Sequence, residues 1–369
     1  MRAISMSSYV LITHTPWMEA PRVRHQIARL IAGAGHRSYF FERASYPWQA
    51  AGAPAEEVEP GITVVRSKRL LHHQVRVVPP LDWANSAIVL SEISTRMREL
   101  SIDPESTVIN FAHDYHFLRR IFPGNRIVTV YHDDIEAQAK FPWFGHVTRS
   151  IRRTCRMSDE VLALSTPLVE RLRAWCEPKL FLPWAIRTYS EPTGDPAQRH
   201  LLLYWGFIDV SMDTERVRAV CEHLARTRPS WRVMLVGPSQ SAARRAATLA
   251  NLEGIGNLDV LDQHPLSALP MDRVAAAFIP YRRKSDTDAT ELPNKSLQLL
   301  SYGVPILKSG MPAMIRRPFI VALDEGIGIE ESIAACVQNF RAWQPAIRTF
   351  LEENSPAARL RALGIEPLT

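Results

Sequence analysis

Two stretches of the chain combine residue types that could carry out chemistry. In the first, His132, Asp133 and Asp134 follow directly on the β-branched run at 127–131. An imidazole or a carboxylate at the end of a strand is well placed to accept a proton from a hydroxyl group. Asp133 or Asp134 is therefore a candidate general base. The alternative is that these carboxylates only hold backbone N–H groups at the next turn.

The second stretch, residues 278–305, joins an apolar strand to a helix through a polar loop. Asn294 can cap the first turn of this helix, and Gly303 ends it. Lys295 and Gln298 lie one turn apart on the same face. A helix N-terminus with an adjacent lysine attracts negative charge, so the start of this helix is a candidate anion site.

Short apolar runs alternate with helical periodicity around both stretches, which predicts an α/β fold of two Rossmann-like domains with mostly parallel sheets. The turn-rich segment 190–198 marks the predicted boundary. We expect a first domain at 1–189, a second at 190–345, and a C-terminal helical segment at 346–369. Pro345 should kink or break the helical pattern that spans 333–350.

Ligands of such sheets bind beyond the carboxyl ends of the strands, so the loop residues found there are binding candidates. A glycine after a strand also lets the backbone approach a diphosphate. The alternative for the first loop is that its aromatic residues simply pack it. The candidates are His14, Thr15, Trp17 and His113 in the first domain and Gly206, Gly237 and Tyr281 in the second.

Composition narrows the class of protein. A hydrophobic content of 46% and a charged content of 22% are ordinary for a globular protein. The four cysteines are widely spaced and match no metal-binding pattern. His113, Asp114 and His116 could suggest a metal, but they share one loop and no third, distant ligand is apparent, so no metal site is expected. The first strand is followed by no G-x-G-x-x-G fingerprint, so no dinucleotide cofactor is expected. No signal peptide or apolar run long enough to span a membrane is evident, which favours a cytoplasmic protein.

A net charge of +6 favours an anionic partner. The chain carries no nucleic-acid motif, so a membrane surface or a nucleotide sugar ranks above nucleic acid. Residues 141–156 place three aromatic side chains before a helix with four arginines on one side, which suits contact with anionic lipid. The alternative is a solvated basic face over a packed aromatic loop.

The segment that contains Lys295 also carries a family resemblance. The run P-N-K-S-L-Q-L-L-S-Y-G-V-P, preceded by I-P-Y-R, resembles the donor-binding segment of GT-B glycosyltransferases. It resembles the teichuronic-acid and exopolysaccharide branch, whose common form is P-x-K-x-x-E-Y-x-A-x-G-x-P. It is also similar to the glucuronosyltransferase of xanthan assembly, which has Lys and Gln at the Lys295 and Gln298 positions. At 183–187 the chain has P-W-A-I-R where the family often has P-x-G-x-D, so it lacks the Gly and the Asp of that phrase.

The resemblance implies two domains that face a central cleft, with the first loop on the acceptor side. It implies that Lys295 neutralises phosphate, that Gln298 hydrogen-bonds the ribose or the sugar, and that Tyr281 lies against uracil or sugar. Asn294 is counted with them as a donor-binding residue. The reaction implied is metal-independent transfer of a hexose from a UDP-sugar, with no cofactor. The acceptor implied is a lipid-linked or polysaccharide precursor in bacterial exopolysaccharide synthesis, at the inner face of the cell membrane.

Stereochemistry is less directly indicated. Many retaining relatives carry two glutamates eight positions apart, where this chain has Thr290 and Gln298. That departure, together with the carboxylates at Asp133 and Asp134, favours inversion. Two other functions stay open on the same fold. One is a nucleotide-sugar 2-epimerase, and the other is a non-catalytic protein that binds sugar nucleotides.

Overall fold

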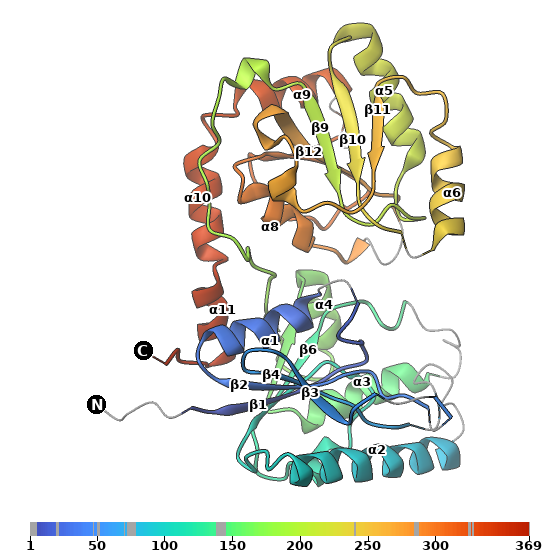
Figure 1. Cartoon of the computed structure of the whole chain (residues 1–369), viewed down its shortest axis with the longest axis vertical. Helices are drawn as coiled ribbons and strands as arrows, with labels where there is room; N and C mark the ends of the chain where they lie inside the picture. Colours follow the sequence, from blue (N-terminus) through green and yellow to red (C-terminus); the bar gives the residue numbers. More distant parts are fainter. Residues whose placement is uncertain are drawn as a thin grey trace. The chain divides into compact units, whose positions relative to one another are not determined.

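The computed structural model describes residues 6–19, 22–46, 48–49, 52–69, 71, 79–137, 145–239, 241–283, 288–323, 326 and 328–368. The chain forms two compact units, each with its own sheet (Figure 1). The first unit is Met1–Leu182 together with Pro356–Thr369, and the second unit is Pro183–Ser355. The predicted α/β class with two parallel-sheet domains is confirmed.

The sheet of the first unit has eight strands, and all neighbouring pairs are parallel except β3 with β4. β1 pairs with β2 on one side and with β5 on the other, so the direction of strand order reverses between β1 and β5. Such a switch point is where open α/β sheets bind ligands. The order across the sheet is β3 (Ala55–Glu59), β4 (Ile62–Val65), β2 (Arg37–Phe41), β1 (Ser8–Ile12), β5 (Thr107–Asn110), β6 (Ile127–Tyr131), β7 (Glu160–Ala163) and β8 (Lys179–Leu180).

Helices cover both faces of this sheet, which explains why its central strands are buried along almost their whole length. In Figure 1, α1 and α2 lie on opposite faces. Val89 and Ile93 of α2 belong to the same hydrophobic core cluster as Val10 and Ile12 of β1. The helices of the unit are α1 (Val23–Gly33), α2 (Pro79–Glu99), α3 (His146–Met157), α4 (Thr166–Leu172) and α11 (Pro356–Leu363).

The sheet of the second unit has six strands, and its neighbouring pairs are all parallel. Its switch point lies between β9 and β12. The order is β11 (Leu258–Leu261), β10 (Arg232–Val236), β9 (Leu201–Trp205), β12 (Val274–Pro280), β13 (Ile306–Ser309) and β14 (Ile320–Ala322). The helices are α5 (Thr214–Thr227), α6 (Ala242–Ala250), α8 (Asn294–Leu300), α9 (Ile329–Gln338) and α10 (Gln344–Glu353).

Two local predictions about the second unit have different outcomes. The helical pattern at 333–350 is broken as expected, because α10 begins with Pro345 in its first turn. The predicted cap of α8 is wrong. Asn294 is the first helical residue, Pro293 holds the cap position, and no side chain caps the turn.

The C-terminal segment is part of the first unit through contacts at the amino-terminal side of its sheet. The Leu368 N–H donates to the Ala34 carbonyl at 2.8 Å. His36 Nε2 lies 2.8 Å from the Glu366 carbonyl oxygen. Arg126 donates to the Leu363 carbonyl at 2.7 Å.

Candidate functional site

In the first unit, polar residues gather where β1, β5 and β6 end. These strands are neighbours and run parallel, so the loops that follow them meet at one edge of the sheet. His14, after β1, lies 2.5 Å from Asp114, after β5, measured between Nε2 and Oδ1. The edge of the Tyr115 ring faces the His14 ring, with centroids 4.9 Å apart. The His14–Asp114 pair therefore bridges the switch point between β1 and β5.

His132 lies beside this pair and is held as a neutral ring. Arg24 Nη1, from the first turn of α1, lies 2.9 Å from His132 Nε2. A guanidinium can only donate, so Nε2 accepts and carries no proton. Burial lowers the pKa of His132 well below its usual range, and the nearby Arg24 cation lowers it further. His132 therefore gives no positive charge to its neighbours near neutral pH.

The two carboxylates that the sequence could not separate lie in different surroundings. Asp133 is half-exposed at 45%, with Oδ2 at 3.3 Å from His132 Nε2. The Asp134 side chain is only 3% exposed and is ion-paired with Arg171. Asp134 also accepts the Ala137 N–H at 3.0 Å. These contacts give Asp134 a structural task and leave Asp133 reachable from solvent.

The other acceptor-side candidates are built into the loops. The Trp17 ring packs against the rings of His25 and Phe40, with centroids 5.1 and 5.0 Å away. Thr15 is buried, and its backbone N–H donates to Thr13 Oγ1 at 3.2 Å. His113 is also buried, and its carbonyl accepts from Thr154 Oγ1 at 2.7 Å. Two of these candidates meet an acid: the His14 ring pairs with Asp114, and the Trp17 backbone N–H donates to Glu42 Oε2 at 2.9 Å.

In the second unit, Lys295 lies between two tyrosines near the ends of β9 and β12. Its ammonium donates to the Tyr204 hydroxyl at 3.0 Å and lies 4.2 and 4.6 Å from the ring centroids of Tyr204 and Tyr281. The Tyr204 hydroxyl in turn donates to the Phe207 carbonyl. Lys295 forms no ion pair with any acid in the described part of the chain. Ring faces and a hydroxyl stabilise the cation without neutralising it.

Gly206 and Gly237 bring two strand ends close to this lysine. A Cβ at Gly206 would lie 2.6 Å from Lys295 Nζ, and a Cβ at Gly237 would lie 1.9 Å from the Gly206 carbonyl oxygen. Their φ angles, +147° and +152°, also favour glycine. The absence of side chains here is a packing requirement, and it exposes backbone next to the ammonium.

Buried polar atoms without a hydrogen-bond partner in the described part of the chain lie near the start of α8, on the side of Lys295. Among the described residues, Asn294 Oδ1, Gln298 Nε2 and Ser309 Oγ have no hydrogen bond. Buried polar groups are nearly always satisfied in folded proteins, so each of these atoms calls for a partner. Asn294 and Gln298 start and continue the same helix turn as Lys295, so a ligand held by the lysine would lie beside them.

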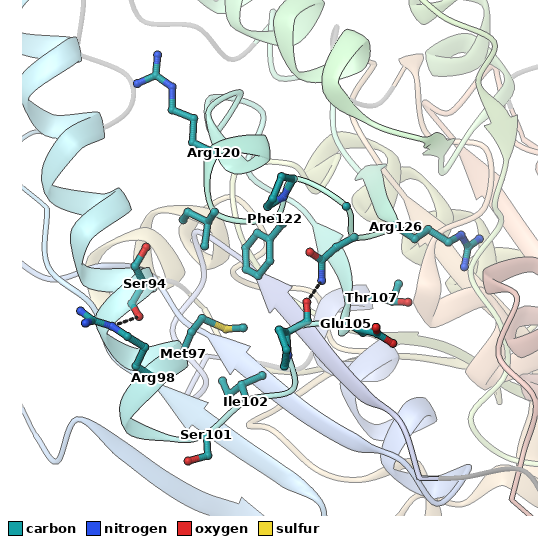
Figure 2. Close-up of a pocket in the computed structure, with 15 residues that line it drawn as sticks. Ser94, Met97, Arg98, Ser101, Ile102, Glu105, Thr107, Arg120, Phe122 and Arg126 are labelled. Carbon is teal, nitrogen blue, oxygen red and sulfur yellow. Dashed lines mark hydrogen bonds between the residues drawn. The ribbon is translucent and has the colours of Figure 1, made fainter.

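A hollow of about 930 Å³ in the first unit lies away from these residues (Figure 2). Its lining includes Thr107 and Arg126, at the amino ends of β5 and β6, so it is at the opposite edge of the sheet from Asp114 and Asp133. Arg126 is already paired with Glu160. Figure 2 shows the Arg120 side chain extending away from the apolar side chains of the hollow. We therefore place the chemistry at the carboxyl edge and not in this hollow.

The helix with four arginines that was predicted within residues 141–156 is α3, which has one buried face and one basic face. Val147, Ile151 and Cys155 are buried. Arg149, Arg152, Arg153 and Arg156 are exposed. The aromatic residues of the predicted lipid contact, at 141–144, lie outside the described residues. None of the described helices is long and apolar enough to cross a membrane.

Two side chains of these sites, Arg24 and Tyr204, carried no signal that singled them out in the sequence. Arg24 belongs to an ordinary amphipathic helix, and Tyr204 belongs to an apolar strand. Asp114 stood out only as part of a histidine-rich loop. Their positions depend on strand order, which brings His14 to Asp114 across 100 residues.

No protein-family model and no curated protein matches the chain. Solved structures do match over nearly the whole length. One is an α,α-trehalose-phosphate synthase (UDP-forming) from Burkholderia xenovorans in complex with glucose-6-phosphate, with a TM-score of 0.66, 12% identity, and coverage of 98% of this chain and 99% of that one. Another is the lipopolysaccharide outer core galactosyltransferase WaaB in its apo form, with a TM-score of 0.62, 15% identity, and 98% of each chain covered.

A third similar structure is Anabaena Alr3699/HepE in complex with UDP, with a TM-score of 0.65, 10% identity, and 98% of each chain covered. These neighbours are GT-B glycosyltransferases. At such low identity the likeness shows the fold alone. The chain therefore has the two-domain α/β fold of the GT-B glycosyltransferases.

Proposed function

We propose that this protein is a glycosyltransferase that moves a hexose from a UDP-sugar to a lipid-linked or polysaccharide acceptor in bacterial surface-glycan synthesis. The observation that carries the proposal is the Lys295 ammonium, which has no acidic partner among the described residues and lies beside Gly206 at the start of α8. A diphosphate is the ligand class that needs a cation, a helix N-terminus and close backbone together. The fold shared with glycosyltransferases, one of them with UDP bound, supports it.

In this proposal the second unit binds the donor. Lys295 and the N-terminus of α8 bind the diphosphate and stabilise its charge as it leaves, so the mechanism we propose needs no metal. Gln298 and Asn294 have the unsatisfied amide atoms that hydrogen bonds to ribose or sugar would use. One face of the Tyr281 ring contacts the Lys295 ammonium. The rest of the Tyr281 ring is proposed to lie against uracil or sugar.

The first unit is proposed to bind the acceptor and supply the base. Asp133 is favoured over Asp134, because Asp134 is buried in its pair with Arg171. In an inverting transfer, the acceptor hydroxyl oxygen attacks the anomeric carbon as its proton passes to Asp133. The bond from that carbon to the diphosphate breaks, and UDP leaves with the electron pair. Inversion is also supported by Thr290 and Gln298, which stand where many retaining relatives have glutamates.

We also propose peripheral attachment to an anionic membrane surface on the cytoplasmic side. The support is the exposed row of arginines on α3. Arginines on one face of a surface helix bind anionic headgroups by electrostatic attraction, at about 1 kcal/mol each near the surface. A lipid-linked acceptor would then be reached from the membrane.

A panel of nucleotide sugars tests the function. A donor present at about 100 times its Kd should add roughly 2.7 kcal/mol of stability and raise the melting temperature, and sugars linked to UDP should do so most. With the best donor and a lipid-linked acceptor, product NMR should show an inverted anomeric centre. Retained configuration would overturn the proposed mechanism. Turnover of the donor to a 2-epimer without acceptor would favour an epimerase, and UDP binding without any UDP release would favour a binding protein.

A further inference from the structure

Arg24 is a buried cation with few partners. Its side chain belongs to the first turn of α1, and the residue is only 6% exposed. One guanidinium nitrogen donates to His132, which is neutral, and Nε has no hydrogen-bond partner among the described residues. Arg24 forms no ion pair with any acid that the structure describes. Asp133 and Glu19 are near enough to raise its pKa, but burial outweighs them and lowers that pKa to about 10.

Such an arrangement is costly for the fold. An unpaired charge in the interior loses its hydration, and proteins usually pair it or replace it with an apolar residue. With a pKa of about 10, Arg24 still carries its charge near neutral pH. A half-exposed neighbour, Arg22, is 3.4 Å from Glu19 and so does have an acidic partner. The buried charge of Arg24 therefore does not stabilise the fold, so its presence calls for another explanation.

The N-terminus of α1 adds to the same positive field. The helix has eleven residues, and its first turn contains no acid. Arg22 and His25 form a capping box, in which the Arg22 N–H donates to His25 Nδ1 at 3.1 Å. Side chains in a helix lean toward its N-terminus, so the Arg24 guanidinium and the N–H groups that the capping box leaves unused share one region. The region lies at the end of β6, because the guanidinium reaches His132. Asp133 is the next residue along.

We propose that Arg24 and the N-terminus of α1 bind a phosphate group carried by the acceptor. A phosphate has three oxygens for charge-assisted hydrogen bonds, which matches a forked guanidinium beside several N–H groups better than a carboxylate does. This inference rests on the proposed function for the identity of the ligand as an acceptor. It adds that the acceptor is a phosphorylated saccharide or lipid-linked phosphate, fixed beside Asp133 through its acid group.

Binding of inorganic phosphate by calorimetry tests the site at low ionic strength. All proteins are the full chain with Lys295→Met, which removes the proposed donor anion site. The parent is compared with Arg24→Met, Arg24→Lys and the control Arg29→Gln. Arg29 lies on the same helix but is exposed and paired with Glu59. Sodium glucuronate is titrated in parallel to compare a carboxylate.

We expect the parent and Arg29→Gln to bind phosphate equally, and more tightly than glucuronate. Arg24→Met should lose about tenfold or more in affinity, since a charged hydrogen bond is removed. Its melting temperature should be equal to or above that of the parent, because an unpaired buried charge is gone. Arg24→Lys keeps the charge and should retain part of the affinity.

The site is overturned if the parent binds no phosphate, if Arg24→Met binds it as well as the parent, or if Arg24→Lys loses binding as fully as Arg24→Met. Tighter binding of glucuronate would overturn phosphate as the ligand. UDP binding by the protein with Lys295 intact is measured separately. If Arg24→Met binds phosphate as well as the parent while the protein with Lys295 intact binds UDP, this inference alone is wrong. If the parent binds phosphate but the protein with Lys295 intact does not bind UDP, the proposed function is wrong instead.

Discussion

The ammonium of Lys295 and the hydroxyl of Tyr204 are joined by a hydrogen bond of 3.0 Å between a helix start and a strand. Tyr204 is fully buried, and burial raises the pKa of its hydroxyl well above the usual range, so it stays protonated. The hydroxyl donates onward to the Phe207 carbonyl and can only accept from the lysine. This chain of two bonds fixes the ammonium without cancelling its charge.

Lys295→Met is expected to weaken UDP binding about tenfold or more, because it removes a charge-assisted hydrogen bond of roughly 1.5–3 kcal/mol. Tyr204→Phe keeps the ring and the charge and should weaken binding less. Lys179→Met, an exposed lysine of the first unit, is the control. Calorimetric titration with UDP measures all three. Equal UDP affinity in Lys295→Met and wild type would exclude Lys295 from the donor site.

Gly237→Ala is expected to weaken UDP binding and to destabilise the second unit by roughly 1–3 kcal/mol, the usual cost of a strained backbone. The new Cβ would lie 1.9 Å from the Gly206 carbonyl oxygen, so the two strand ends must separate. Gly256→Ala is the control, since a Cβ there meets no atom within 4 Å. Thermal melts measure the loss of stability, and calorimetric titrations measure the loss of UDP affinity. An unchanged melting temperature would show that the loop tolerates the side chain.

Asp133→Asn is expected to slow sugar transfer about 10²–10⁴-fold with UDP binding intact, the typical cost of losing a general base. Asp134→Asn should mainly lower the melting temperature, because Arg171 loses its buried partner. The two readouts, kcat and melting temperature, should therefore separate the pair. Near-normal kcat in Asp133→Asn would return that residue to a structural role.

Replacing Arg152, Arg153 and Arg156 together with Gln should reduce sedimentation with anionic liposomes. These side chains are exposed on α3, and their attraction to lipid is screened by salt. Wild-type sedimentation should fall as ionic strength rises. A triple change of exposed arginines elsewhere, at Arg226, Arg244 and Arg283, controls for total charge. Equal binding of wild type to neutral and anionic vesicles would contradict an electrostatic attachment.

Acid should weaken the link between α5 and α9. Hydrogen bonds from Arg228 and then His223 lower the pKa of Glu330 to about 2, from an unfolded value near 4.3. A lowered acid pKa stabilises the fold above the unfolded pKa, and this stability is lost as pH falls from about 4.5 toward 2. Glu330 is 40% exposed, so the contribution should stay below about 1 kcal/mol. Urea midpoints of Glu330→Gln should vary less over this pH range than those of wild type or of Glu222→Gln.

Regular apolar runs let the sequence predict the central strands closely. The run at 127–131 is β6 itself, and the run at 201–205 is β9. Sequence reasoning missed β3, whose residues are mostly acidic and none of which is buried. β3 owes its structure to antiparallel pairing with β4 at the edge of the sheet, and single-strand periodicity does not report such pairing.

Some residues of the candidate sites could likewise be predicted from the local sequence, and others could not. Lys295 could be named from its place after a strand and a loop, because local order decides its position. Asp133 and Asp134 could not be separated, because Arg171 approaches from a helix more than thirty residues later. The burial of Arg24 depends on how α1 packs over the sheet, and that packing leaves no local signature.

The C-terminal segment has a consequence for how the protein is made. Pro356–Thr369 belongs to the first unit, so the second unit is an insertion between two parts of the first. During synthesis, all residues of the second unit are therefore made before the last segment of the first unit. Leu360, Leu363 and Ile365, which are buried in the first unit, leave the ribosome only after the whole of the second unit. A nascent chain stalled near residue 355 would present a finished second unit and a first unit with its final helix missing.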